Sequence, residues 1–163
     1  MRHRAYLSLG SNLGDRIANL RSCIRLLRKV GKVTRVSSIY ETEPMEVREQ
    51  PWFLNCVVEL ETHLSPRELL SRIQQIETKL GRSRQIEKGP RTLDIDILLF
   101  DSEVINNGQL QIPHRAMHKR RFVLAPLAEI SAQWKHPVLG KTVEELLHRL
   151  DASGGEVRRL APK

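Results

Sequence analysis

The fold of this chain is decided by residues 53–81, which read FLNCVVELETHLSPRELLSRIQQIETKLG. The first twelve residues alternate between two faces, as expected of a half-buried strand. Residues 65–68 then form a capping box, with Pro66 at the first helical position, so a helix follows the strand directly. Its apolar stripe at helical spacing consists of Leu69, Ile73, Ile76 and Leu80, and Gly81 ends it.

The strand over residues 53–64 has two faces of different chemistry. One face is apolar throughout, with Leu54, Cys56, Val58 and Leu60. The other carries Phe53, Asn55 and Val57, so an aromatic ring and an amide point the same way. We therefore predict a core on the first face and a polar site on the second.

The flanking segments continue the alternation of strands and helices. We predict a strand over 5–9 and a helix over 16–30, capped by Asp15 and ended by Gly31 in the C′ manner. The apolar face of that helix is Ile17, Leu20, Ile24 and Leu27. The remaining predictions are a strand over 33–40, a mobile loop over 41–51, a strand over 93–100, a hairpin turning at Asn107-Gly108, and helices over 122–130 and 142–150.

This order of elements favours an α+β class, a ferredoxin-like sandwich in which two helices cover one face of a mostly antiparallel sheet. With 163 residues and no repeat or linker, we predict a single domain over 1–163. No apolar run of membrane length exists, so neither membrane spanning nor export is expected. Cys23 and Cys56 lack metal-type spacing and are predicted to be buried free thiols in a reducing cytoplasm.

The net charge of +8 attracts anions, and nucleic acid, acidic lipid and polyphosphate all fit it. Asp94 and Asp96 decide among these partners, since alternation puts both carboxylates on one strand face, with Ile95, Ile97 and Leu99 on the other. Hard oxygen ligands suit Mg²⁺, and two such ions clamp a transferring phosphoryl group. An isolated Asp-x-Asp pattern marks a solvent-exposed strand face more often than a metal site.

Basic residues on both sides of this pair favour a triphosphate site over a solvated face. Arg82, Arg84, Lys88 and Arg91 precede it, in a segment that begins after Gly81 and contains Gly89-Pro90. A second basic group follows Pro113 and consists of His114, Arg115, His118, Lys119, Arg120 and Arg121. Gln74 and Glu77, beside the apolar stripe of their helix, reach either the same cleft or solvent. No P-loop or protein-kinase glycine-rich loop is present, so side chains and metal must hold the phosphates.

At these residues the chain resembles the 6-hydroxymethyl-7,8-dihydropterin pyrophosphokinases of folate biosynthesis. The most specific segment is residues 89–98, GPRTLDIDIL, and the resemblance extends over essentially the whole chain. It implies that pyrophosphate passes from the cosubstrate ATP to the pterin alcohol, with two Mg²⁺ ions on Asp94 and Asp96. Catalysis is then positioning and charge neutralisation, and no general base is demanded.

The resemblance also assigns roles to individual residues. The catalytic set is Asp94, Asp96, Arg82 and Arg91. The ATP contacts are Gln74, Glu77, Arg82, Arg84, Arg91, Leu98, His114, Arg115 and Arg120. The pterin is implied to lie between Phe53 and Phe122, with further contacts from Asn55, Asp94, Thr42, Pro44 and Met45. The implied partners are these two small molecules, with no nucleic acid and no membrane, and the protein is expected to be a monomer.

Two departures from the family pattern concern the nucleotide end. The loop between Arg84 and Arg91 is one residue short and lacks a tryptophan, and Arg115 replaces a frequent aromatic. The sequence disfavours two other functional classes. A nucleotidyltransferase would use Gly10-Ser11, but over eighty residues separate that pair from Asp94. A non-enzymatic RNA-binding module fits the pI near 10, but the chain is only 4% aromatic and has no aromatic-plus-basic motif.

Overall fold

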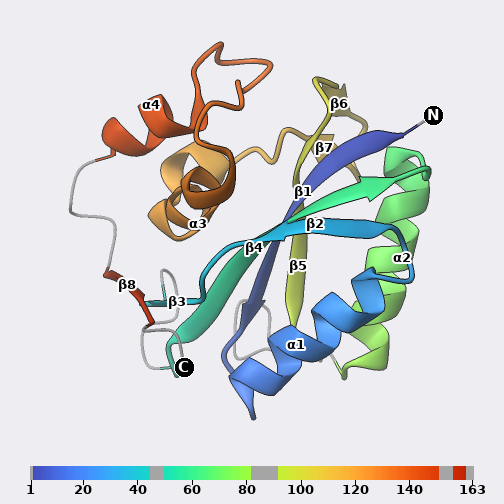
Figure 1. Cartoon of the computed structure of the whole chain (residues 1–163), viewed down its shortest axis with the longest axis vertical. Coiled ribbons are helices and arrows are strands. Elements are labelled where there is room, and N and C mark those ends of the chain that lie inside the picture. Colours follow the sequence, from blue (N-terminus) through green and yellow to red (C-terminus); the bar gives the residue numbers. More distant parts are fainter. Residues whose placement is uncertain (1, 45–49, 82–91, 151–155, 161–163) are drawn as a thin grey trace.

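The computed structural model describes residues 2–44, 50–81, 92–150 and 156–160. Its main sheet has the strand order β5-β1-β4-β3-β8, and β2 pairs with the other end of β4 (Figure 1). The strand pairs of this sheet within the described residues are all antiparallel. The strands are β1 (His3–Ser11), β2 (Lys32–Val36), β3 (Tyr40–Thr42), β4 (Phe53–Thr62), β5 (Asp94–Phe100) and β8 (Val157–Arg159).

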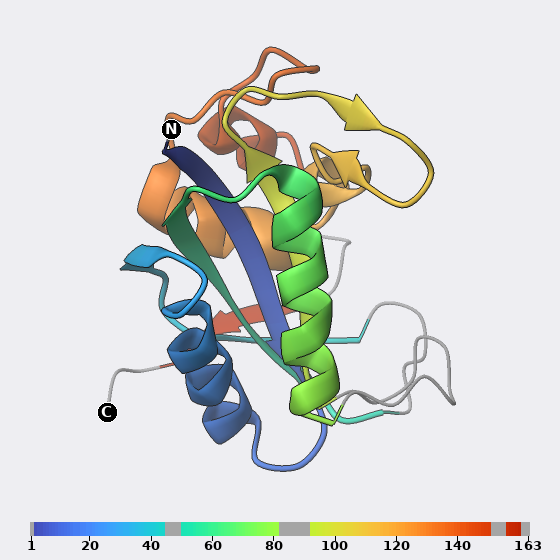
Figure 2. The ribbon, with the colours of Figure 1, turned by 90° about the vertical axis from the view of Figure 1, so that its right-hand side faces the viewer.

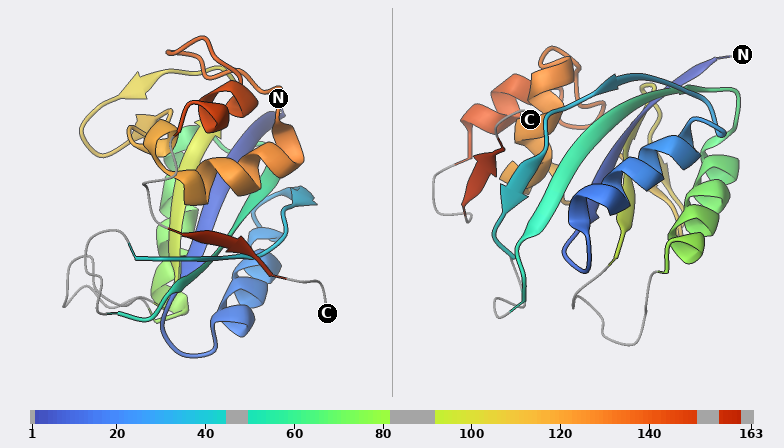
Figure 3. Two further views of the ribbon diagram at one scale, coloured as in Figure 1. Left: turned by 90° about the vertical axis from the view of Figure 1, so that its left-hand side faces the viewer. Right: turned by 60° about the horizontal axis from the view of Figure 1, so that its bottom comes forward.

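Helices cover both faces of this sheet (Figure 3). The helices α1 (Arg16–Leu27) and α2 (Pro66–Lys79) lie on one face, and α3 (Arg121–Ser131) and α4 (Val143–His148) lie on the other. A 3-10 turn, η1 (Met117–Lys119), precedes α3, and a small hairpin consists of β6 (Ile105–Asn106) and β7 (Gln111–Ile112). The ferredoxin-like α+β prediction is confirmed, and α3 and α4, which the prediction did not assign to a face, form a layer on the second face.

The sequence signals at the helix starts act as predicted. Ser65 Oγ accepts the backbone N–H of Glu68 at 3.2 Å, and the Glu68 carboxylate accepts the Ser65 N–H at 3.0 Å. The same reciprocal pair joins Thr142 and Glu145. Asp15 accepts the Ala18 N–H at 3.1 Å at the start of α1. Such caps satisfy backbone donors that have no partner inside the helix.

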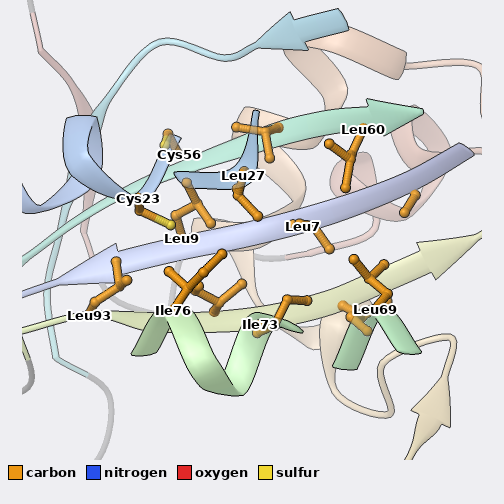
Figure 4. Close-up of a cluster of buried hydrophobic side chains, with 14 of the residues drawn as sticks. Leu7, Leu9, Cys23, Leu27, Cys56, Leu60, Leu69, Ile73, Ile76 and Leu93 are labelled. Atoms are coloured by element: carbon orange, nitrogen blue, oxygen red, sulfur yellow. The ribbon is translucent and has the colours of Figure 1, made fainter. Parts of the chain in front are cut away.

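Each face of the sheet has its own buried core. The helices α1 and α2 lie side by side against the sheet (Figure 2). The first core cluster joins β1, β4 and β5 to these helices through residues such as Leu7, Leu9, Leu27, Leu60, Leu69 and Ile73 (Figure 4). The second core cluster joins the same strands to α3 and α4, through Tyr6, Val57, Leu99, Leu124 and Leu127 among others. The predicted division of β4 into two faces is confirmed.

The strand β5 departs from simple alternation. Tyr6 pairs with Leu99 whereas Leu7 pairs with Ile97, so Leu98 is an extra residue in β5. As a result, Leu98 and Leu99 both pack in the second core cluster. The prediction that Leu99 shares a face with Ile97 is therefore wrong, because a bulge shifts the alternation after Ile97.

Two further predictions near β2 are wrong. The single strand over 33–40 is split into β2 and β3, because Ser37 Oγ accepts the Val57 N–H at 2.9 Å in place of a backbone carbonyl. Gly31 does not end α1 in a left-handed conformation, since α1 ends at Leu27. A Cβ on Gly31 would lie 2.3 Å from the Glu61 carbonyl oxygen, so glycine is required there by the approach of β4.

None of the helices within the described ranges has the length and apolar composition needed to cross a bilayer.

Candidate active site

A cavity of about 580 Å³ opens on the face of the sheet that carries the second core cluster. Its floor is the central strand β1, where Ser8 and Gly10 point to the same side. Both side chains are small, so the strand fills little of the space above it. The neighbouring strands β5 and β4 therefore project their longer side chains into one shared volume, which is of the size usual for small-molecule sites.

The acidic wall of the cavity comes from β5. In the β1–β5 register Asp96 lies opposite Ser8, and Asp94 lies opposite Gly10. The two aspartates are one strand repeat apart, about 7 Å, and both line the cavity. The Asp96 side chain is 40% exposed, so solvent and ions reach it. Two carboxylates on one strand face offer the hard oxygen ligands that Mg²⁺ prefers.

The opposite wall comes from β4, which carries Phe53 and Asn55. The Asn55 amide is buried, held through its nitrogen by Thr42, and close to Gly10 through its oxygen. Its Nδ2 donates to Thr42 Oγ1 at 2.5 Å, and its Oδ1 lies where a Cβ on Gly10 would approach within 2.7 Å. An amide fixed in this way presents a defined pattern of donor and acceptor to a flat heterocycle.

The strand β3, which carries Thr42, is held in turn by β8. The Glu43 N–H donates to the Glu156 carbonyl at 3.0 Å, and Tyr40, Glu41 and Thr42 pair with β8. Arg158 of β8 stacks over the Trp52 ring at 4.8 Å. The strand β8 runs beside β3 (Figure 3, left) and thus positions the Thr42 side of the cavity.

The third wall is the segment from His114 to Phe122. The His114 N–H donates to the Leu98 carbonyl at 2.9 Å, which ties the start of this segment to β5. Met117 is fully buried in the second core cluster and anchors its middle. The segment brings Arg115, Lys119 and Arg120 to the cavity. The Arg120 guanidinium also lies 5.6 Å from the Phe122 ring centre.

His114 is the titratable group of the cavity whose pKa is most clearly shifted. Burial, followed by the charges of Arg120 and Arg115, lowers its pKa to about 4, against an opposing effect of Asp94. The ring is therefore neutral at pH 7. Its Nδ1 accepts the Ala116 N–H at 3.2 Å, which leaves the hydrogen on Nε2, 4.0 Å from Asp96 Oδ1. The sequence pattern placed His114 in the second basic group. In the structure its ring is neutral and offers the Nε2–H as a hydrogen-bond donor.

The structure brings most of the predicted site residues to this one cavity. Those that line it are Thr42, Pro44, Phe53, Asn55, Asp94, Asp96, His114, Arg115, Arg120 and Phe122. The predicted contacts Met45, Arg82, Arg84 and Arg91, together with Lys88, lie outside the described residues. Their roles stay predictions.

Three predicted nucleotide contacts lie away from the cavity lining. The Leu98 side chain is 1% exposed in the second core cluster, and its carbonyl holds His114. Glu77 is 4% exposed and its Oε2 accepts the Ile95 N–H at 2.9 Å, so it satisfies a donor of edge strand β5. Gln74 is exposed on α2.

Sequence reasoning missed several residues that line the cavity, among them Ser8, Glu43 and Gln50. A signal for Ser8 existed, since it alternates with Gly10 on one face of a strand whose other face is apolar. Gln50 accepts a hydrogen bond from Asn12 at 2.7 Å, a contact between distant loops that no local pattern announces.

Known proteins resemble this chain in sequence and in fold. Residues 6–132 match the family described as 7,8-dihydro-6-hydroxymethylpterin-pyrophosphokinase (HPPK). The 2-amino-4-hydroxy-6-hydroxymethyldihydropteridine pyrophosphokinase of Bacillus subtilis is 53% identical over 135 residues, covering 82% of this chain and 81% of that protein. The enzyme of the same name from Methylorubrum extorquens is 42% identical over 155 residues, covering 94% and 97%.

Among solved structures, wild-type HPPK-DHPS of Plasmodium falciparum with pterin and p-hydroxybenzoate superposes with a TM-score of 0.75 at 19% identity. The match covers 91% of this chain and 42% of that protein, so the chain spans less than half of its length. At this identity the likeness concerns the fold alone.

Proposed function

The chain belongs to the 7,8-dihydro-6-hydroxymethylpterin-pyrophosphokinase family, and we propose that it transfers pyrophosphate from ATP to the hydroxymethyl group of 6-hydroxymethyl-7,8-dihydropterin, releasing AMP. This activity belongs to folate biosynthesis, with ATP as cosubstrate. One observation carries the proposal. A carboxylate pair and an aromatic-plus-amide pair face each other across the small residues of one strand, inside one cavity.

The acceptor end of the reaction fits the wall formed by β4 and Phe122. A pterin is flat and has donors and acceptors along its edge. Phe53 and Phe122 would stack on its two faces, and the fixed amide of Asn55 would read its edge. Thr42 and Pro44 border the same space. The hydroxymethyl group would then point along the cavity toward Asp94.

The phosphate end fits the wall formed by β5 and residues 114–120. Asp94 and Asp96 would hold two Mg²⁺ ions, whose chemistry when bound is neutralisation of the triphosphate charge. The donor set fits these ions, because both carboxylates share one partly exposed strand face. Arg115, Lys119 and Arg120 would bind phosphate oxygens, and the neutral Nε2–H of His114 would donate a hydrogen bond without adding charge.

Transfer in this arrangement depends on alignment. The hydroxymethyl oxygen attacks the β-phosphorus and loses its proton to solvent, the bond from that phosphorus to the α-phosphate oxygen breaks, and AMP leaves with the electron pair. The pterin wall orients the attacking oxygen and the basic wall orients the triphosphate, so two bound reactants meet in one geometry. Among the described residues we assign none as a general base.

Three further properties are proposed with this function. Residues 1–163 form one catalytic domain that works as a monomer on small molecules and does not require nucleic acid. It acts in the cytoplasm, which agrees with two buried free thiols, Cys23 and Cys56. Burial raises the pKa of the Cys56 thiol to about 12, so it is unreactive there.

The proposal is tested by AMP release from ATP in the presence and absence of Mg²⁺ and 6-hydroxymethyl-7,8-dihydropterin. Release should require both. Asp94→Asn and Asp96→Asn should each lower the rate by at least about 100-fold, while circular dichroism and Tm stay those of a folded protein. Asp15→Asn is the matched control, since it removes one charge outside the cavity and asparagine caps a helix equally well.

Each alternative class predicts a different result in this assay. A nucleotidyltransferase would release pyrophosphate in place of AMP, and an RNA-binding module would turn over no ATP and bind RNA with a strong dependence on salt. Wild-type rates in both Asp94→Asn and Asp96→Asn would contradict the assignment of the site.

A further inference from the structure

Three side chains with metal-binding atoms lie close together at one end of the β1–β5 strand pair. This is the end away from the cavity. The three residues are His3 at the start of β1, and Asp101 and Glu103 in the turn after β5. Their donor atoms lie within 4.8 Å of one another. Asp101 lies five positions after Asp96, which is about 17 Å along an extended strand. This cluster is therefore separate from the candidate active site.

Two of the three donors are already fixed in place. His3 Nδ1 lies 2.7 Å from Asp101 Oδ2, and the His3 ring packs on Phe100 with ring centres 4.9 Å apart. The other oxygen of Asp101 accepts the Arg4 N–H at 2.8 Å, while the Asp101 N–H donates to the Arg4 carbonyl at 2.8 Å. One nitrogen and one oxygen therefore already lie side by side, and a bound ion would take the place of the hydrogen between them without rearrangement of the backbone.

Glu103 supplies the third donor, and its carboxylate has no role in holding the described part of the fold together. Its backbone N–H donates to the Phe100 carbonyl at 3.0 Å, which holds the turn. Its side chain is exposed and has no hydrogen bond or ion pair with another described residue. The carboxylate is consequently available to a ligand.

The neighbouring cations do not fill this cluster. The Arg4 guanidinium lies 5.7 Å from the Trp134 ring, on the opposite face of the sheet from Phe100. Arg4 and Arg2 are both oriented to Glu61, at 4.0 and 3.6 Å. Neither guanidinium therefore forms an ion pair with Asp101 or Glu103.

We propose that His3, Asp101 and Glu103 form a binding site for a borderline divalent ion, Zn²⁺. The donor set is one imidazole nitrogen and two carboxylate oxygens, with water completing the coordination. Imidazole and carboxylate are both established zinc ligands, whereas Mg²⁺ prefers oxygen donors throughout. The chain would then have two cation sites of different chemistry at opposite ends of one strand pair.

Binding at this site joins the start of β1 to the turn that follows β5. An ion that binds the folded chain and not the unfolded chain stabilises the fold. At a free Zn²⁺ concentration about 100 times the Kd, Tm should rise by about 5 °C or more for a domain of this size. This readout does not depend on catalysis.

The test is isothermal titration of Zn²⁺ into untagged full-length protein in excess Mg²⁺, with Tm measured in parallel. We expect one Zn²⁺ per chain that Mg²⁺ does not displace. The decisive variant is Glu103→Gln, which leaves the contact between His3 and Asp101 in place. It should leave the metal-free Tm unchanged and weaken Zn²⁺ binding at least about tenfold. His3→Gln and Asp101→Asn should weaken it as strongly.

Two control variants separate this site from other places where zinc binds. His148→Gln removes an exposed imidazole elsewhere and should leave the binding step unchanged. Asp96→Asn should also retain it, since that residue belongs to the cavity. No saturable Zn²⁺ binding in the wild type, or equal affinity in Glu103→Gln, would show that His3 and Asp101 form an ion pair only and would overturn the proposal.

Discussion

The glycine at position 10 gives the sharpest test of how the cavity recognises its acceptor. A Cβ added there would lie 2.7 Å from Asn55 Oδ1, and ordinary contact begins at 3.4 Å, so in Gly10→Ala the amide must retreat by about 0.7 Å. The retreat is blocked on the other side, because Asn55 Nδ2 already lies 2.5 Å from Thr42 Oγ1. The amide therefore has to rotate out of its position.

The size of the effect follows from what the amide is proposed to do. Loss of one hydrogen bond to the pterin costs about 1 to 1.5 kcal/mol, which corresponds to about a tenfold rise in the KM for the pterin. The KM for ATP should change by less than about twofold, since the phosphate wall lies on β5. Overpacking should also lower the free energy of unfolding by about 1 to 3 kcal/mol.

The assay is the steady-state rate of AMP formation with the pterin varied at saturating ATP, carried out as a double-mutant cycle with Asn55→Ala. Once the amide is absent, the new methyl group has nothing to displace. Gly10→Ala should then change the KM for the pterin by less than about 0.3 kcal/mol in free energy. If it weakens pterin binding equally with and without Asn55, the reasoning is refuted.

The remaining predictions concern stability. Ser65→Ala removes the cap of α2 and should cost about 1 kcal/mol, or about 2 to 4 °C in Tm, whereas Ser65→Asn should cost little; equal Tm values for both would contradict the capping role. Glu77→Leu leaves the Ile95 N–H without its acceptor and should cost about 1 to 3 kcal/mol in urea unfolding. Glu77→Gln should keep that bond, and a large rise in the KM for ATP in this variant would indicate a nucleotide contact instead. Burial and the hydrogen bond to Glu59 raise the pKa of Tyr6 from 10.0 to about 12. The Tyr6 phenol therefore loses its proton at a lower pH in the unfolded chain than in the folded chain, so the free energy of unfolding should fall as pH rises from 10 to 12. Tyr6→Phe should lessen that fall, as measured by urea titrations at each pH.

Much of the fold could be predicted because its signals are local. The capping boxes at Ser65 and Thr142 mark helix starts through contacts within four residues, and both are present. The alternation of Phe53 to Leu60 likewise separates an apolar face from a site face before any partner strand is known. Interactions of this range are contained in a short window of sequence.

The errors arose where a distant segment determines the local geometry. The split between β2 and β3 depends on Ser37 bonding to Val57, and the bulge at Leu98 depends on the register with β1. Gly31 is glycine because of Glu61, thirty residues later. None of these partners is visible from the segment itself.

The candidate site was predictable in its residue types and less so in its electrostatics. Asp94, Asp96, Phe53 and Asn55 were identified and do line one cavity. The neutral state of His114 follows first from burial, which the sequence does not show, and then from Arg120 and Arg115, whose closeness to the ring the sequence does not show. Ser8, on the floor of the cavity, was not predicted for a related reason. It lines a site only because β5 and β4 flank β1, and the sequence does not show this strand order.

The central claim is that the whole pyrophosphoryl group moves to the pterin across this cavity. It is tested most directly by ³¹P NMR of the products formed from ATP, Mg²⁺ and 6-hydroxymethyl-7,8-dihydropterin. AMP and a pterin carrying both phosphorus atoms should appear in equal amounts, and Asp96→Asn should suppress both together. Formation of ADP, or of free pyrophosphate with AMP attached to the acceptor, would contradict the claim.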